Sequence, residues 1–326
     1  MKIAGTFTAA LALAFDLALG ASFSNPLKEF NGSDPFIVYS DGFYYLMTTT
    51  WTNIQVTRSA TLEGLKSGET KVVWEDPDPS RCCNVWAPEV HWLDNKWWIY
   101  YASSAEGDTA NQRMRVLEGG ATPFDPYSYA GQLFDEWAID LSVIRVADAN
   151  YFAYSCFRSE IQSLCIAPMN TPASAGTPSL LSQPSEEWEK FGSFAVNEGP
   201  VGLYHDGDTY IVYSGSNCWE PEYQLGYLKY DGAGNPLLVS SWAKTGPVFS
   251  SANGNYGTGH NGFFTSPDGT ETWNVYHATT IQTGSCDGNR YTAAQKVNWN
   301  ADGSPDFGEA AALGTVLDGP SGEPSS

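Results

Sequence analysis

Residues 34–46 read DPFIVYSDGFYYL: an apolar segment, a turn at Asp41-Gly42, and a second segment rich in aromatic residues. Asp-Gly supplies the positive φ angles that a two-residue hairpin turn requires. β-Branched and aromatic residues on both sides of the turn favour strands over helices. The stretch therefore predicts an antiparallel β-hairpin.

The same pattern recurs four more times, at residues 88–101, 141–154, 199–213 and 261–276. Its turn aspartates stand at positions 41, 94, 148, 206 and 268, so the period is 53–62 residues. Such a period has room for about four strands, which is one blade of a radial β array, whereas a β-sandwich turns about every 8–12 residues. We therefore expect an all-β chain folded as a five-bladed β-propeller, in a single domain over residues 21–318.

The two ends of the chain differ in composition from this repeat. Lys2 followed by an apolar run from Ile3 to Leu19, with small residues at 18 and 20, predicts a signal peptide over residues 1–20 and a secreted, extracellular protein. Residues 319–326 are rich in Gly, Pro and Ser and predict a flexible C-terminal tail.

The formal net charge of −21 limits the classes of partner. An acidic surface repels phosphate backbones and anionic lipids, so we expect neither a nucleic acid nor a membrane as partner. Neutral polysaccharides or oligosaccharides fit this charge. We expect the protein to act as a monomer.

Six cysteines in an exported chain favour disulfide bonds, for which 15 pairings exist. Cys156 and Cys165 flank a short stretch and are placed to join one hairpin. Cys82 and Cys83 are adjacent, so they form either a vicinal ring or bonds elsewhere. Without a Cys-x-x-Cys or paired Cys/His pattern, a zinc site is not expected.

The repeat places several polar residues in one register. Counting back seven or eight positions from each turn aspartate reaches a residue that would begin the innermost strand of its blade. The residues reached are Asp34, Ala87, Asp140, Glu198 and His260. Like charges around a narrow axis raise one another's pKa and oppose folding, and Ala87 shows that no acid is needed there structurally. The three carboxylic acids therefore predict a catalytic site.

Glycoside hydrolysis uses such a set of acids. One carboxyl group protonates the departing oxygen, and a second activates water or attacks the anomeric carbon. A third carboxylate can keep the pKa of the acid high. Binding a catalytic metal ion is the competing use of three acids. No second histidine occupies the same position of the repeat, however, so we expect no metal ligands and no required cofactor.

These motifs resemble those of glycoside hydrolase family 43 in their order along the chain. The matching stretches are residues 31–35 (NGSDP), 85–91 (VWAPEVH), 138–140 (AID), 197–200 (NEGP), 259–261 (GHN) and 299–308 (WNADGSPDFG). The resemblance implies a five-bladed propeller and hydrolysis with inversion. By motif, Asp34 matches the general base, Asp140 the acid that orients and modulates, and Glu198 the general acid.

The resemblance also implies residues that contact the substrate. Trp86 matches an aromatic wall, Arg290 a substrate-contacting arginine, and His260 a residue near a central ion or water cluster. The resemblance thus suggests a structural calcium ion near His260, which would contact the histidine through water because Ca²⁺ prefers oxygen ligands. The chain departs from the family at Leu141, where many members have proline.

Among the members of the family, the stretches 82–90 and 198–213 are most similar to α-L-arabinofuranosidases that trim 1,5-linked arabinan. The expected activity is release of L-arabinofuranose from arabinan or other plant cell-wall glycans. A β-xylosidase, an endo-arabinanase, a non-catalytic glycan-binding propeller and a retaining hydrolase of fructans remain alternatives.

Overall fold

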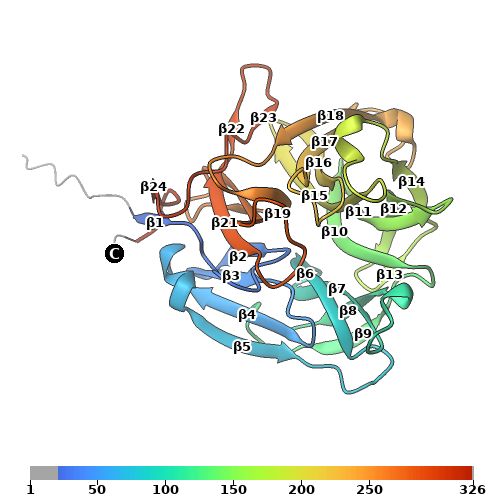
Figure 1. Cartoon of the computed structure of the whole chain (residues 1–326). Coiled ribbons are helices and arrows are strands. Elements are labelled where there is room, and N and C mark those ends of the chain that lie inside the picture. The colour runs from blue at the N-terminus through green and yellow to red at the C-terminus, as the bar shows by residue number, and fades with distance from the viewer. Residues whose placement is uncertain (1–20, 325–326) are drawn as a thin grey trace, which may run out of the picture.

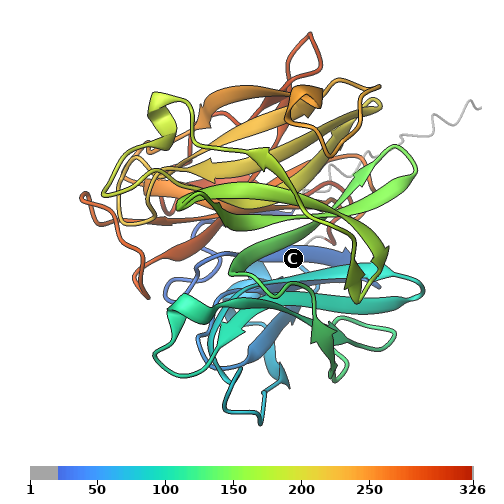
Figure 2. The ribbon, with the colours of Figure 1, turned by 90° about the vertical axis from the view of Figure 1, so that its right-hand side faces the viewer.

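The computed structural model describes residues 21–324, and these contain no α-helix. The strands form five sheets arranged around a central axis, and the first strand of each sheet lies nearest the centre of Figure 1. Turned by 90°, the first two blades (blue and cyan) lie below the third to fifth (green to orange) (Figure 2). The predicted all-β five-bladed propeller is confirmed.

Each blade is an antiparallel meander whose strands pair in chain order. The first blade consists of β2 (Phe36–Ser40), β3 (Phe43–Met47), β4 (Ile54–Ser59) and β5 (Glu69–Trp74). The second blade consists of β6 (Cys83–Leu93), β7 (Lys96–Ser104), β8 (Arg113–Glu118) and β9 (Ser128–Gln132). The third blade consists of β10 (Ala138–Val146), β11 (Ala149–Arg158) and β12 (Ile161–Thr171), and β12 also pairs with β13 (Ser174–Ala175) and β14 (Ser179–Ser182). The fourth is β15 (Asn197–His205), β16 (Asp208–Gly215), β17 (Gln224–Tyr230) and β18 (Trp242–Phe249), and the fifth is β19 (Tyr256–Thr265), β20 (Thr272–Thr279) and β21 (Tyr291–Lys296).

The predicted aspartate turns join the first two strands of each blade. Asp41, Asp94 and Asp206 have φ angles of 50°, 50° and 47°. Aspartate tolerates this left-handed region better than most residues, which explains why aspartate recurs at these turns.

The ring is closed by the N-terminal segment, which lies along β21. The backbone N–H of Leu27 donates to Thr292, and that of Thr292 donates to Lys28. The buried amide of Asn25 completes the edge, because it donates to the carbonyl of Ala294 and accepts from its N–H, both at 2.9 Å. The start of the chain thus covers the outer edge of the three-stranded fifth blade.

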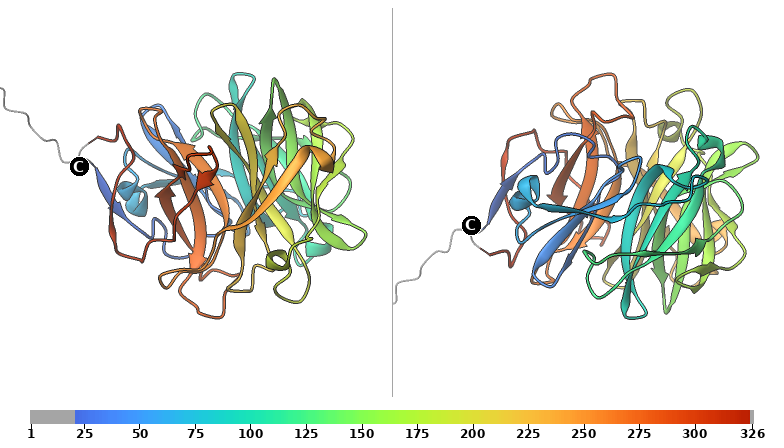
Figure 3. Two further views of the ribbon diagram at one scale, coloured as in Figure 1. Left: turned by 90° about the horizontal axis from the view of Figure 1, so that it is seen from above. Right: turned by 90° about the horizontal axis from the view of Figure 1, so that it is seen from below.

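A small outer sheet joins the two described ends of the chain. There β1 (Ser22–Ser24) pairs with β24 (Val316–Asp318), and Figure 3 shows the two strands side by side. The hairpin of β22 (Asn298–Trp299) and β23 (Pro305–Asp306) follows the fifth blade.

Hydrophobic cores fill the interfaces between neighbouring blades. Tyr100 of the second blade packs in one cluster with Phe152 of the third, and Leu164 of the third packs in another with Ile211 of the fourth. Burial against neighbours on both faces explains why the repeat contains near-continuous apolar and aromatic runs.

The structure describes little of the two chain ends for which the sequence made predictions. The signal peptide predicted at residues 1–20 lies outside the described residues. Residues 319–324 follow β24, and Glu323 accepts a hydrogen bond from the backbone of Leu62, but the flexibility expected of residues 319–326 stays a prediction. Within residues 21–324, no helix is long and apolar enough to cross a membrane.

Candidate active site

Every blade has a residue in the left-handed region just before its first strand or within that strand's first half. These residues are Asp34, Ala87, Asp140, Gly199 and His260, with φ angles between 41° and 58°. Register shifts at this point interrupt the pairing in the second to fifth blades. Such bulges re-aim a side chain, as for Asp140 and His260, which line the central cavity together with Asp34 of the first blade.

The fourth blade corrects the predicted register. Counting along the sequence placed Glu198 in the ring, but the left-handed position belongs to Gly199. A Cβ atom on Gly199 would lie 3.2 Å from the ring of His260, so the glycine leaves room for the histidine as well as the φ angle. Glu198 enters the site from the preceding position.

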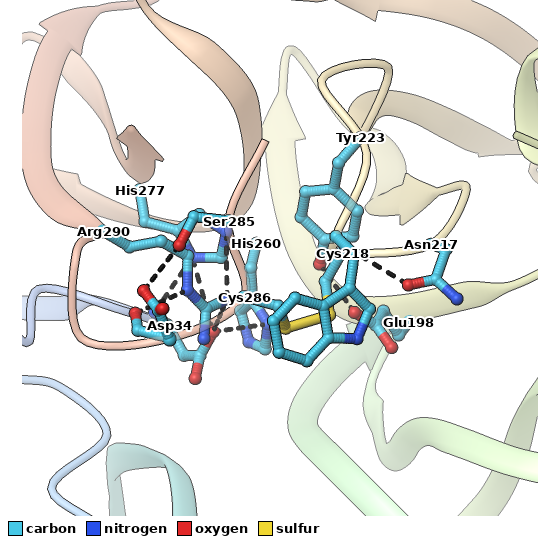
Figure 4. The surroundings of a disulfide bond; sticks show 12 residues. Asp34, Glu198, Asn217, Cys218, Tyr223, His260, His277, Ser285, Cys286 and Arg290 are labelled. Carbon is cyan, nitrogen blue, oxygen red and sulfur yellow. Dashed lines mark hydrogen bonds and ion pairs between the residues drawn. A yellow bond between two sulfur atoms is a disulfide. The ribbon is translucent and has the colours of Figure 1, made fainter. Parts of the chain in front are cut away.

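One cavity of about 270 Å³ contains all six predicted site residues. Its lining includes Asp34, Trp86, Asp140, Glu198, His260 and Arg290. Figure 4 shows Asp34 and Glu198 on either side of His260. The fold therefore brings together residues that are separated by up to 256 positions in the chain.

Asp34 is held by cations and donors from the first and fifth blades. Its carboxylate accepts from the hydroxyl of Thr49 at 2.5 Å, and Oδ1 lies 3.4 Å from Arg290 and 3.3 Å from both His260 and His277. Burial by itself would raise the pKa of Asp34, but Arg290 and the two histidines lower it well below its usual value. Asp34 is therefore ionised at neutral pH.

Glu198 and Asp140 form the opposite electrostatic environment. Burial, together with the charges of Glu198 and Asp34, raises the pKa of Asp140 to about 8. Burial and the charge of Asp34 raise the pKa of Glu198, although His260 and the hydroxyl of Tyr223 oppose the rise. Because the two carboxyl groups titrate together, they retain a proton near neutral pH as a pair.

Two amide or hydroxyl donors fix the Glu198 carboxyl group. Gln162 donates to Oε2 at 2.8 Å, and Tyr223 donates to Oε1 at 2.9 Å. Asp140 accepts from the backbone N–H of Gly199 at 3.2 Å. These contacts define the orientation of both acids before any substrate binds.

His260 lies between the acids. Its Nδ1 is 3.3 Å from Asp34 and 3.9 Å from Asp140. Burial would lower the pKa of His260, but the carboxylates of Asp34, Asp140 and Glu198 raise it. The three carboxyl groups therefore favour the charged form of this imidazole, which lies between them.

The structure does not support the calcium ion that the resemblance suggested near His260. Within residues 21–324, no three His, Cys, Asp or Glu side chains are grouped so as to hold a metal ion. The nearest carboxylate oxygens face the imidazole of His260 and the guanidinium of Arg290 rather than a shared oxygen-lined position.

Several cavity residues were missed because they lie outside the counted register. Thr49, Trp51, Asn217, Cys218 and Trp219 follow the second strand of their blades, Gln162 begins a third strand, and Trp137 and Phe194 precede a first strand. An antiparallel meander returns to the same end after two strands, so this geometry would have identified most of them. His277 at the end of β20 was missed for the same reason.

Trp51 has unusual backbone geometry for a bulky residue. Its φ angle is 72°, and its backbone forms two hydrogen bonds with Val85 of the next blade. The ring packs edge-on to Trp86. Strain of this kind at a cavity wall indicates a positional requirement.

The three disulfides resolve the pairing. Cys156–Cys165 joins β11 to β12 as expected, Cys82–Cys83 is vicinal, and Cys218–Cys286 joins the loops that follow β16 and β20. The last bond lines the cavity beside the loop that carries Arg290 (Figure 4). It connects the fourth blade to the arginine that lowers the pKa of Asp34.

The arrangement combines an ionised carboxylate and a pair of carboxyl groups that retains a proton in one cavity. Such a separation of pKa values is what general base and general acid chemistry requires at one pH. Exposed indole rings of Trp51 and Trp219 at the same cavity offer flat apolar surfaces.

Comparisons with known proteins agree with this chemistry. The family model described as Glycosyl hydrolases family 43 matches residues 23–305. An extracellular exo-α-(1→5)-L-arabinofuranosidase from Streptomyces avermitilis is 35% identical over 314 residues, covering 90% of this chain and 65% of that protein. The α-L-arabinofuranosidase 43 of Humicola insolens is 33% identical over 328 residues, covering 93% of this chain and 67% of that protein.

A solved structure shows the same architecture. An α-L-arabinofuranosidase from Lactobacillus brevis superposes with a TM-score of 0.83 at 30% identity, covering 90% of this chain and 98% of that one. The present chain spans about two thirds of the length of the Streptomyces and Humicola proteins.

The Cys218–Cys286 bond is expected to support both stability and the shape of the cavity. It spans 68 positions, so its removal in Cys218→Ser/Cys286→Ser should cost roughly 4 kcal/mol by chain entropy. Because the loop of Arg290 is then less restrained, turnover should also fall at temperatures where the variant is folded. Urea unfolding and steady-state kinetics measure the two effects.

The matched control is Cys156→Ser/Cys165→Ser, whose bond spans only nine positions within the third blade. It should cost roughly 3 kcal/mol and leave turnover of the folded enzyme unchanged. Equal kinetic effects in both double variants would contradict a role for Cys218–Cys286 in the cavity.

Proposed function

The chain belongs to family 43 of the glycosyl hydrolases, and from that premise we propose that it releases L-arabinofuranose from the ends of arabinan or related plant cell-wall glycans by an inverting mechanism. The named arabinofuranosidases that it resembles support the choice of sugar. The opposite pKa shifts of Asp34 and Glu198 in one cavity carry the choice of chemistry.

Asp34 acts as the general base in this proposal. Its low pKa keeps it ionised, and it accepts a proton as water attacks the anomeric carbon. Thr49 and Arg290 hold the carboxylate in place. Inversion needs this water on the face of the sugar opposite the departing oxygen.

Glu198 acts as the general acid. Burial raises its pKa, which favours the protonated form, and in this proposal that proton passes to the leaving oxygen. Gln162 and Tyr223 orient it. Asp140 does not touch the leaving oxygen in this scheme; it shares the retained proton with Glu198 as a coupled pair.

The cavity size supports exo action. Sites for drug-sized ligands enclose roughly 300–1,000 Å³. A volume of about 270 Å³ therefore suits one terminal sugar residue rather than the middle of a chain. Trp86 and Arg290 line the cavity and are the proposed contacts to that sugar.

Two separate observations support the proposal that the protein is secreted. Residues 1–20 have the composition of a signal peptide, and three disulfides suit an oxidising compartment. We propose that the enzyme acts outside the cell as a monomer on a neutral polysaccharide or oligosaccharide, with no cofactor.

Product analysis tests the proposed substrate and mode. Wild-type enzyme incubated with arabinan, arabinoxylan and xylan should release free arabinose without a ladder of oligosaccharides. Proton NMR at early times should show the β-anomer from an α-linked substrate, because direct displacement inverts the anomeric carbon.

Each other product pattern contradicts one part of the proposal. An early ladder of arabino-oligosaccharides would show endo action, and free xylose from xylan would show a β-xylosidase. An initial α-anomer would replace direct displacement with a covalent intermediate, as expected of a retaining enzyme.

Substitution of the two acid–base residues should give different substrate dependence. An aryl arabinofuranoside has a good leaving group that departs with little protonation, whereas a sugar hydroxyl needs the acid. Glu198→Gln should therefore lose most activity on arabinan and keep much more on the aryl arabinoside. Asp34→Asn should lose about 10²-fold or more on both, because water needs the base in either reaction.

Steady-state kcat/KM on both substrates provides the measurement. A melting temperature equal to that of the wild-type enzyme shows that each variant is folded. The same substrate dependence in the two variants would show that the roles of Asp34 and Glu198 are assigned wrongly.

The pH dependence of Asp140→Asn tests the third carboxyl group. Glu198 donates only while protonated, so activity falls as pH rises through the pKa of the acid. A neighbouring carboxylate raises that pKa, and the amide removes the charge at nearly constant shape. The basic limb of kcat/KM against pH should therefore move to lower pH. A basic limb at the wild-type position would show that Asp140 does not modulate the acid.

A further inference from the structure

The cavity has a distinct side for each of the two proposed reactive carboxyl groups. Asp34 is held by Thr49 of the first blade and by Arg290 and His277 of the fifth. Glu198 starts the fourth blade and is held by Gln162 of the third. In direct displacement the general acid contacts the departing oxygen, so the rest of the glycan must leave the cavity on the side of Glu198.

A row of side chains crosses the third blade on that side. Trp137 and Phe157 are in ring contact, with centroids 4.5 Å apart. Phe157 of β11 lies directly opposite Gln162 of β12 in the strand register, so their side chains lie on one face of the sheet. Gln162 then donates to Glu198. The aromatic pair is thus joined to the proposed general acid through one residue.

This aromatic pair is fixed in place and open to solvent. The indole Nε1 of Trp137 donates to the carbonyl of Thr109 at 3.2 Å, which fixes the ring that lines the cavity. Arg158, next to Phe157, forms an ion pair with Glu136 at 2.9 Å. Phe157 itself is 41% exposed and lies outside the cavity lining.

Phe194 supplies a second exposed ring on this side, because it stands two residues before Val196, whose backbone pairs with Gln162. It precedes β15 by three residues, lines the cavity and is 54% exposed. Single exposed aromatic residues are ordinary on protein surfaces, but these rings continue outward from a cavity wall beside one particular carboxyl group. Flat apolar rings with polar surroundings suit the C–H face of a neutral sugar.

We propose that Phe194 and the Trp137–Phe157 pair form an acceptor-side binding site for the sugar residues that follow the scissile bond. Phe194, at the cavity mouth, contacts the second residue of the chain, and Phe157, farther out, contacts the third. The site takes neutral pentose residues of the glycan backbone and sets a preference for chains of three or more. This inference rests on the proposed function, since it uses Glu198 as the general acid.

Chain-length kinetics test the site. Wild-type, Phe194→Ala and Phe157→Ala enzymes are compared on an aryl α-L-arabinofuranoside and on 1,5-linked arabino-oligosaccharides of two, three and four residues. Phe157→Ala should keep wild-type kcat/KM on the aryl substrate and the disaccharide and lose about tenfold on the longer chains, the scale expected of a truncated aromatic contact. Phe194→Ala should already lose activity on the disaccharide.

Two further variants separate binding from folding. Phe157→Trp keeps a flat ring and should retain the preference for longer chains. Trp92→Ala removes an aromatic ring of similar exposure, 49%, near the aspartate turn of the second blade, where it borders a different hollow of the surface, and should match wild type on every substrate.

The outcomes distinguish this inference from the proposed function. If wild-type enzyme releases arabinose but Phe157→Ala loses nothing on long chains, or loses equally on all substrates, the acceptor site is wrong and the function stands. If wild-type enzyme cleaves none of these arabinosides, both are overturned.

Discussion

The site depends on a backbone constraint that is repeated once per blade: a residue at positive φ stands just before the innermost strand or within its first half. For Asp34, Asp140 and His260 this conformation costs of order 1–3 kcal/mol each, and packing between blades must compensate for it. The kink turns these side chains toward the axis instead of leaving them along a sheet face. In the fourth blade a glycine takes the constrained position and the imidazole of His260 covers it. The acid of that blade therefore comes from the residue before.

Electrostatic asymmetry follows from which blades supply the cations. The chain carries a net charge of −21, yet Arg290, His260 and His277 surround Asp34. Burial lowers the pKa of His277 to about 3, so its imidazole is neutral, whereas Arg290 is a cation and the surrounding carboxylates raise the pKa of His260. Glu198 receives neutral donors, an amide and a phenol, which orient it without compensating fully for its desolvation. Identical chemical groups thus acquire opposite protonation states within one cavity.

The loops after the second strand of the first, fourth and fifth blades shape much of the cavity wall. They return to the end at which the inner strands begin, and they contribute the strained Trp51, the exposed Trp219 and the loop of Arg290. A disulfide between two of these loops, Cys218–Cys286, restrains one wall. The ring of inner strands can therefore keep its acids while these loops decide which glycan enters and how far along the chain the enzyme recognises it.

The sequence alone determined the blade count and the strand order, because a 53–62-residue repeat of hairpins is a local pattern that turn chemistry and strand preference make visible. The repeat also placed Asp34, Asp140, Glu198 and His260 in one register, and the family resemblance added Trp86 and Arg290; all six line one cavity. The sequence also limited the cysteine pairing to a set that included a bond between Cys156 and Cys165. The displacement of Glu198 by one position, the donors that hold each acid, the Cys218–Cys286 bond and the aromatic row of Trp137 and Phe157 were decided only by the tertiary structure. The reason is physical: a bulge shifts a side chain without changing the residue pattern, and a pKa depends on charges and burial contributed by blades hundreds of residues apart.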